Sequence, residues 1–302
     1  MTVETDGLGA PPAALPPKSL WRRFSANPVA LGGLIVFVLL AVMAVFAPWV
    51  TPQDPYDLSS ISLLDNLRPP GSTGVSGQTF YFGTDPNGRD MYSAMVYGMR
   101  TSIFIGLTSA LIALMIGATV GLVAAFAGGW LDAALMRLVE LVLAFPTILI
   151  ALVLMSIFGS GIDKLLIAMI MAQWAGFARV TRSAALVEME REYITATRAM
   201  GFSRVRVLLR HLLPNCLPPL MVLATIQVAD AIALEATLSF LGLGVPVTEP
   251  SLGLLIASGF DYILTERYWI TIFPGILLLI LVMSVNLAGD HLRNLLNPRL
   301  QK

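Results

Sequence analysis

Long apolar runs separated by short polar segments dominate the chain. The first run, residues 29–50, has about 22 residues, enough at about 1.5 Å each to cross a bilayer core about 30 Å thick and too many for a cleaved leader. Five further runs follow at residues 102–127, 131–158, 165–180, 217–240 and 269–288. The pattern predicts an all-α integral membrane protein with six transmembrane helices.

A polar segment, residues 51–100, joins the first two runs. Asp85 is suited to cap a helix and Pro86 to occupy its first position. Apolar residues recur at helical spacing behind them: Met91, Tyr92, Met95 and Met99. We therefore expect an interfacial helix here that leads into the second span.

Glycines mark the middle of the chain. Gly117 and Gly121 have the four-residue spacing that lets two membrane helices approach closely. Gly128 and Gly129 break the chain after the second run. The third run, residues 131–158, is interpreted as a single span. The fourth is short enough to require either snorkelling of its flanking charged residues or a helix that extends beyond it.

A charged segment, residues 188–215, interrupts the apolar pattern. Its first half continues a helical stripe made of Leu186, Met189, Tyr193, Ala196 and Met200. Gly201 can adopt the left-handed conformation that ends a helix, and Ser203 can cap the next one. The stripe of this second helix comprises Val205, Leu208, Leu209 and Leu212. The pattern predicts two short amphipathic helices hinged at Gly201 and closed by Pro214.

Composition and charge agree with a membrane protein. The chain is 56% hydrophobic and 13% charged, with a mean hydropathy of +0.78, which excludes an ordinary soluble domain. Its net charge is zero, so nothing favours nucleic acid as a partner. If the N-terminus is cytoplasmic, the cytoplasmic segments carry 14 of the 19 lysines and arginines. The positive-inside rule therefore places both termini and residues 188–215 in the cytoplasm.

Sites for catalysis, metals or nucleotides are not expected in this chain. A phosphate-binding loop needs Gly-Lys, and none of the three lysines follows a glycine. The two histidines, His211 and His291, flank the membrane without ligands at metal-binding spacing, and no span contains the histidine that an intramembrane serine protease would need. The single cysteine, Cys216, excludes an internal disulfide.

Three acids fall within the predicted spans: Glu140, Asp230 and Glu235. A charge in lipid costs several kcal/mol, so these side chains should face protein or water. They are candidates for lining or gating a pathway, with structural hydrogen bonding between helices as the alternative. Asp230 and Glu235, five residues apart, should not share one face of a helix.

The spacing within residues 195–214 resembles a loop of bacterial ATP-binding-cassette importer permeases. The family pattern is E-A-A, three residues, G, nine residues and I-x-L-P. The residues that agree with it are Ala196, Gly201, Leu213 and Pro214. Thr195, Thr197 and His211 depart from it, and because Thr195 replaces the family's glutamate no charged contact is assigned to it. Residues 83–100 and 233–244 resemble the dipeptide, oligopeptide and nickel branch of the same family.

The resemblance implies a type I importer permease fold with a coupling loop between the fourth and fifth spans. The loop residues that it marks for contact with an ATPase are Glu192, Thr195, Ala196, Arg198, Gly201, Phe202, Leu213 and Pro214. It implies a bacterial inner membrane location and a division into a cytoplasmic tail (1–28), a first span (29–50), an extracytoplasmic loop (51–100), a permease core (101–291) and a second tail (292–302).

The resemblance also implies partners. These are a second, similar permease subunit, two ATPase domains or subunits that bind ATP and Mg, an extracytoplasmic substrate-binding protein, and membrane lipid. The expected function is import of di- or oligopeptides, with nickel chelates or glutathione-like solutes as alternatives. A self-sufficient secondary transporter is the competing class. It would be expected to show inverted repeats or a chain of intramembrane ionisable groups, whereas this sequence has no second copy of the hinged loop and only three such acids. A membrane enzyme is disfavoured because the chain has no catalytic set.

Overall fold

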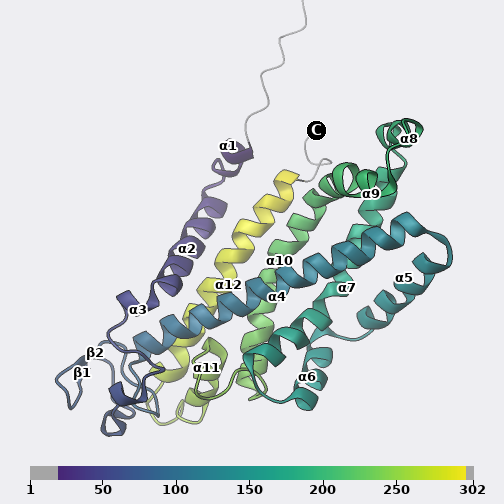
Figure 1. The fold of residues 1–302 in the computed structure, drawn as a ribbon. Helices are drawn as coiled ribbons and strands as arrows, with labels where there is room; N and C mark the ends of the chain where they lie inside the picture. The colour runs from purple at the N-terminus through teal and green to yellow at the C-terminus, as the bar shows by residue number, and fades with distance from the viewer. Residues whose placement is uncertain (1–19, 297–302) are drawn as a thin grey trace, which may run out of the picture.

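A computed structural model describes residues 20–296, mostly as helices (Figure 1). The helices are α1 (Leu20–Phe24), α2 (Pro28–Val45), α3 (Ala47–Val50), α4 (Met91–Ala127), α5 (Gly129–Leu143), α6 (Thr147–Phe158), α7 (Ile162–Met189), α8 (Glu192–Ala199), α9 (Arg204–Arg206), the π-helix η3 (Val207–Leu212), α10 (Leu213–Phe240), α11 (Leu252–Phe260) and α12 (Trp269–Leu296). The polar segment holds two short 3-10 turns, η1 (Leu58–Ser60) and η2 (Leu63–Asp65), and an antiparallel pair of strands, β1 (Ser72–Thr73) and β2 (Thr79–Phe80).

Four described helical segments are long and apolar enough to cross a membrane. They are Pro28–Val45, Met91–Ala127, Arg204–Phe240 and Trp269–Leu295. The bent pair α5 and α6 makes a fifth if it is counted as one span. Helix α7 extends well beyond the short apolar run at 165–180, as predicted, and it packs along α4 in the middle of the bundle.

Close contact between α4 and α7 depends on the paired glycines. A Cβ atom at Gly117 would collide with the backbone of Trp174 and the side chain of Phe177, and one at Gly121 would collide with the backbone of Ala178. The prediction that these glycines permit close helix packing is confirmed. The two helices share a core that includes Ala113, Trp174, Phe177 and Ala178.

No separate interfacial helix precedes the second span in the part of the chain that the structure describes. Helix α4 runs without interruption from Met91, so residues 91–100 begin the span itself. Asp90 is the cap, because its carboxylate accepts a hydrogen bond from the backbone N–H of Ser93. Asp85 instead closes a tight turn, where it accepts hydrogen bonds from the backbone N–H of Arg89 and pairs with its guanidinium at 2.6 Å. The predicted cap at Asp85 and start at Pro86 were wrong.

The third apolar run is not one straight helix. Helices α5 and α6 meet at an angle of 86°, with Pro146 at the N-cap of α6. The residue before a proline is disfavoured in helical conformation, which explains the break at Phe145. The predicted break at Gly128 and Gly129 is present, and both residues have positive φ.

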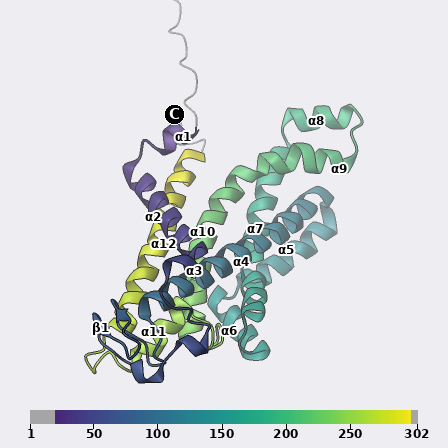
Figure 2. The same ribbon diagram turned by 60° about the vertical axis from the view of Figure 1, so that its left-hand side comes forward.

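The bundle has two distinct ends. Helix α1, the end of α12 and the pair α8–α9 lie at one end, whereas β1, β2 and α11 lie at the other (Figures 1 and 2). Both views show α8 projecting beyond the ends of α7 and α10. Helix α8 therefore projects from the bundle at the same end as α1 and the end of α12.

Candidate functional site

The first helix of the charged segment, α8, has a narrow buried side. Ile194 is fully buried and Thr197 nearly so, while Tyr193, Ala196 and Met200 are exposed. The predicted stripe was therefore wrong: Leu186 and Met189 belong to α7, and the helix breaks before α8 begins at Glu192. The change of helix axis between α7 and α8 places a different pair of residues against the protein.

Gly201 forms the elbow after α8. Its φ is +75°, a conformation that glycine adopts without cost, and a Cβ added there would meet no atom within 4 Å. The backbone N–H of Phe202 donates to the carbonyl of Thr197 at 3.2 Å, which closes the turn. The ring of Phe202 stacks on His211 with centroids 5.8 Å apart. The predicted hinge residue is thus in the predicted conformation.

The second half of the segment is not a separate helix. Helix α9, the π-helix η3 and α10 follow without a gap, and Pro214 lies in the first turn of α10 rather than at the end of a helix. Ser203 occupies the cap position, but its side chain makes no capping hydrogen bond. The segment therefore continues directly into α10, and the prediction that its second helix ends at Pro214 was wrong.

The π-helix changes which residues of this half are buried. Val207 and Leu212 are buried, whereas Val205 and Leu209, two members of the predicted stripe, are exposed. The five-residue spacing of the buried pair fits the wider turn of a π-helix. Leu212 then packs with Cys216 against the ends of α4 and α7, so the elbow is attached to three long helices.

A hydrogen-bond chain joins α8 to α7 and α10. The hydroxyl of Tyr193 donates to a carboxylate oxygen of Glu188 at 2.7 Å and accepts from the side-chain amide of Asn215 at 3.0 Å. The amide of Asn215 also donates to the carbonyl of His211 at 2.7 Å. Partial desolvation of the hydroxyl, together with the Glu188 carboxylate, raises the pKa of Tyr193 to about 12, so the phenol keeps the proton that it donates.

The residues predicted to form the coupling surface gather at this end of the bundle. Glu192, Thr195 and Ala196 are exposed on α8, and Arg198 belongs to the same helix. Gly201 and Pro214 are exposed, and Phe202 and Leu213 are half-buried. Glu192, Thr195 and Ala196 are therefore accessible to another molecule, while Phe202 and Leu213 also pack within the segment.

An ion pair that sequence patterns did not reveal connects α5 to α7. The guanidinium of Arg182 binds both carboxylate oxygens of Asp132, at 2.5 and 2.6 Å. Such two-point pairing fixes the relative orientation of the side chains as well as their distance. The residues are 50 positions apart, and no local spacing predicts their contact.

The three intramembrane acids differ in surroundings. Glu140 is exposed and pairs with Arg137 at 3.2 Å on the same helix. Glu235 is fully buried and accepts hydrogen bonds from the hydroxyls of Ser102 at 2.6 Å and Ser239 at 2.7 Å. The bond from Ser102 joins α4 to α10, whereas the bond from Ser239 lies within α10, and the link between helices favours the structural interpretation for Glu235.

Asp230 is exposed on the opposite side of α10 from Glu235, as their spacing predicts. It lines a groove of about 290 Å³ between α6, α7 and α10. The other lining residues are Thr147, Ile148, Gln173, Gln227, Ala233, Leu234 and Thr237. Polar side chains from all three helices thus meet in a region where apolar ones would be expected if it faced lipid.

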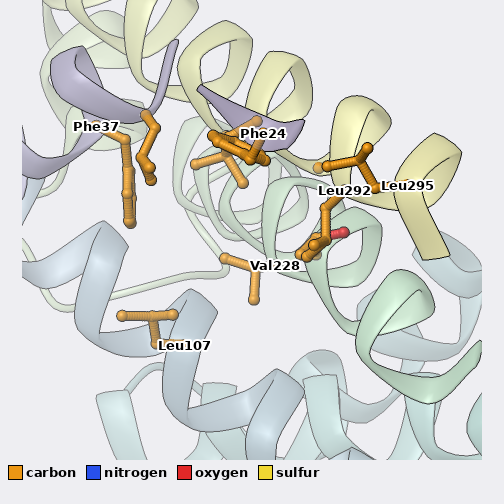
Figure 3. A pocket seen from close by; sticks show the side chains of 11 residues that line it. Phe24, Phe37, Leu107, Val228, Leu292 and Leu295 are labelled. Carbon is orange, nitrogen blue, oxygen red and sulfur yellow. The ribbon is translucent and has the colours of Figure 1, made fainter. Parts of the chain in front are cut away.

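A second cavity, of about 430 Å³, is apolar. Its labelled residues, Phe24, Phe37, Leu107, Val228, Leu292 and Leu295, surround the space between α1, α2, α4, α10 and α12 (Figure 3). Thr225 is the one polar side chain of its described lining, and its hydroxyl donates to the carbonyl of Val222. This cavity offers no chemistry for holding a polar solute.

Fold and site together define a multi-pass α-helical membrane protein with a polar groove between its helices. The chain belongs to the family of binding-protein-dependent transport system inner membrane components, which matches residues 117–302. The N-terminal transmembrane domain of oligopeptide transport permease C matches residues 17–70. The family resemblance inferred from the loop motif is confirmed.

Individual relatives cover almost the whole chain. It is 40% identical to the di/tripeptide transport system permease protein DppC of Pseudomonas aeruginosa, over 95% of this chain and 93% of that protein. It is 36% identical to the oligopeptide transport system permease protein OppC of Bacillus subtilis, over 94% and 91% of the two chains. The inward-facing MetNI methionine ABC transporter shares the fold, with a TM-score of 0.57 and 22% identity over 68% of this chain and 98% of that one.

Proposed function

We propose that the chain is a transmembrane permease subunit of an ATP-driven, binding-protein-dependent importer of di- or oligopeptides. The observation that carries this proposal is the near-complete match to permeases named for di/tripeptide and oligopeptide transport. The groove beside Asp230 supports a polar cargo, because its walls offer hydrogen-bonding groups. The chain contributes the pathway and no catalytic residue.

The proposed topology has six spans with both termini in the cytoplasm. The spans are α2, α4, the bent pair α5–α6, α7, α10 and α12, and residues 51–90 form the extracytoplasmic loop. Helix α1, the end of α12 and α8 lie at one end of the bundle, which agrees with a common cytoplasmic side (Figure 1). The excess of lysine and arginine in the same segments supports this orientation.

The segment 188–215 is the proposed coupling loop. Its exposed α8 side, with Glu192, Thr195 and Ala196, would sit in a groove of a cytoplasmic ATPase. The hydrogen bonds of Tyr193 and the packing of Leu212 would pass a displacement of α8 on to α4, α7 and α10 as a rigid-body movement. ATP and Mg would bind to the ATPase partners.

The complete transporter would contain this chain, a second similar permease, two ATPase domains or subunits and an extracytoplasmic substrate-binding protein. The test is to purify the chain with its co-assembling subunits, reconstitute them in liposomes and measure ATP-dependent uptake of labelled peptides. Accumulation of di- or oligopeptides supports the proposal. Uptake of nickel chelates or glutathione-like solutes without peptide uptake would overturn the substrate assignment, and uptake without nucleotide would identify a secondary transporter.

A further inference from the structure

The groove beside Asp230 is built from hydrogen-bonding groups on three helices. Thr147 comes from α6, Gln173 from α7, and Gln227, Asp230 and Thr237 from α10. The lining contains a carboxylate but no lysine, arginine or histidine. Its fixed charge is therefore negative, and its chemistry suits a cationic, hydrogen-bond-donating group.

Gln173 gives a second, independent indication of a ligand. The side chain is 4% exposed, and its carbonyl oxygen has no hydrogen-bond partner among residues 20–296. A buried amide oxygen without a partner is destabilising, so such a group in a groove wall indicates that something else donates to it. Gln173 lines the same groove as Asp230.

Asp230 also lacks a partner within the part of the chain that the structure describes. No hydrogen bond or ion pair involves its carboxylate there, whereas Glu140 pairs with Arg137 and Glu235 accepts two serine hydroxyls. A helix-to-helix structural role would be expected to show a comparable contact. The carboxylate is exposed in the groove and accessible to a passing solute.

We propose that this groove is a subsite that receives the α-ammonium group of a peptide during passage, with Asp230 supplying the charge and Gln173 a second acceptor. The inference rests on the proposed peptide-import function. A peptide α-amino group has a pKa near 8, so it is largely protonated at neutral pH and can donate up to three hydrogen bonds. Charge-assisted bonds of this kind are stronger than neutral ones.

The first test measures uptake by the reconstituted transporter at saturating substrate-binding protein. Asp230→Asn should lower the maximal rate for a free-amino dipeptide about tenfold, the loss expected for one charge-assisted hydrogen bond. Asp230→Glu should retain most of the rate. Asp290→Asn, the same change at an exposed aspartate of α12 outside the groove, should leave it unchanged. If Asp230→Asn took up the dipeptide at the wild-type maximal rate, the proposed subsite would be overturned, while the importer function would stand.

The second test does not require transport. With Cys216, the single native cysteine, changed to alanine, Thr237→Cys places one thiol in the groove. Cationic and anionic methanethiosulfonate reagents then compete for it, and mass spectrometry of this chain reports the two rates. A thiolate reacts faster with a cationic reagent even in free solution, so the rate ratio is taken relative to the ratio measured on a free small thiol. This rate ratio should be at least about five, and Asp230→Asn should bring it close to one, as expected for a nearby fixed charge.

The two tests separate failure of the subsite from failure of the proposed function. A rate ratio at or below one with Asp230 intact would overturn the subsite even if variants at that position do not insert. A ratio that favours the cation, in a complete transporter that takes up no peptide, would instead support a cation-accepting groove and remove the peptide assignment.

Discussion

Replacing Gly201 tests how the elbow of the charged segment holds α8 in place. The residue has a φ of +75°, and an added Cβ would meet no atom within 4 Å. Steric collision with neighbours therefore contributes nothing, and the cost of a side chain is that of the left-handed backbone alone. For an L-residue that cost is about 1–2 kcal/mol, and a β-branched side chain is among the least tolerant.

Gly201→Val should consequently lower the ratio of native to non-native elbow conformations by a factor of about 5–30, which is what 1–2 kcal/mol means for an equilibrium. Gly201→Asn is the matched control, because asparagine visits the left-handed region readily. If α8 is the surface that binds the ATPase, the affinity of purified ATPase subunits for the permease pair should fall by up to the same factor in the valine variant and much less in the asparagine variant.

The assay is titration of ATPase subunits onto the permease pair in nanodiscs, with uptake measured in parallel. The membrane bundle should keep its thermal midpoint, since a Cβ added at Gly201 would contact none of the long helices. Equal ATPase affinity and equal uptake for the valine variant, with the protein inserted normally, would refute the reasoning about the elbow.

Three further changes test packing and polar contacts in the bundle. Gly117→Ala should destabilise the protein by about 1–3 kcal/mol, because a Cβ there collides with α7. Gly275→Ala is the control: its Cβ meets open space on α12, so the change should be neutral or slightly stabilising. Thermal midpoints measured in one detergent compare the two variants. Glu235→Leu should cost about 1–3 kcal/mol for each buried serine hydroxyl that it leaves without a partner. Glu235→Gln should cost clearly less, because the amide can still accept a hydrogen bond. Equal thermal midpoints for the two variants would contradict the hydrogen-bond assignment. Asp132→Arg should lower the midpoint, and adding Arg182→Asp should restore part of the loss; purely additive effects would argue against a direct pair.

Hydrophobic runs located α2, α4, α10 and α12, which lie in the described segments long and apolar enough to cross a membrane, because each run depends mainly on local composition. The six-span count stays a prediction, since α7 is not among those described segments. Local patterns also identified the glycine contact at Gly117 and the elbow at Gly201, since both follow from backbone and side-chain size at single positions. The bend between α5 and α6 had a signal that was missed, namely Pro146. Proline alone does not decide such cases, because α10 continues through Pro218 and Pro219.

The rest depends on contacts between distant residues. Sequence spacing placed Asp230 and Glu235 on different faces of one helix. It did not indicate which of the two faces is buried against Ser102. The pair of Asp132 with Arg182 and the unpartnered amide oxygen of Gln173 appear only when separate helices are placed together. The stripe predicted for α8 failed for a similar reason, since a break before Glu192 resets which residues face the protein.

The central claim is that this chain forms a peptide pathway driven from outside itself, through the segment 188–215. The most direct measurement compares accumulation of a labelled dipeptide in liposomes that contain the complete set of subunits with accumulation in liposomes that contain this chain alone. The account predicts uphill accumulation that requires ATP and occurs only with the complete set. Uphill movement by this chain alone, without nucleotide, would contradict it.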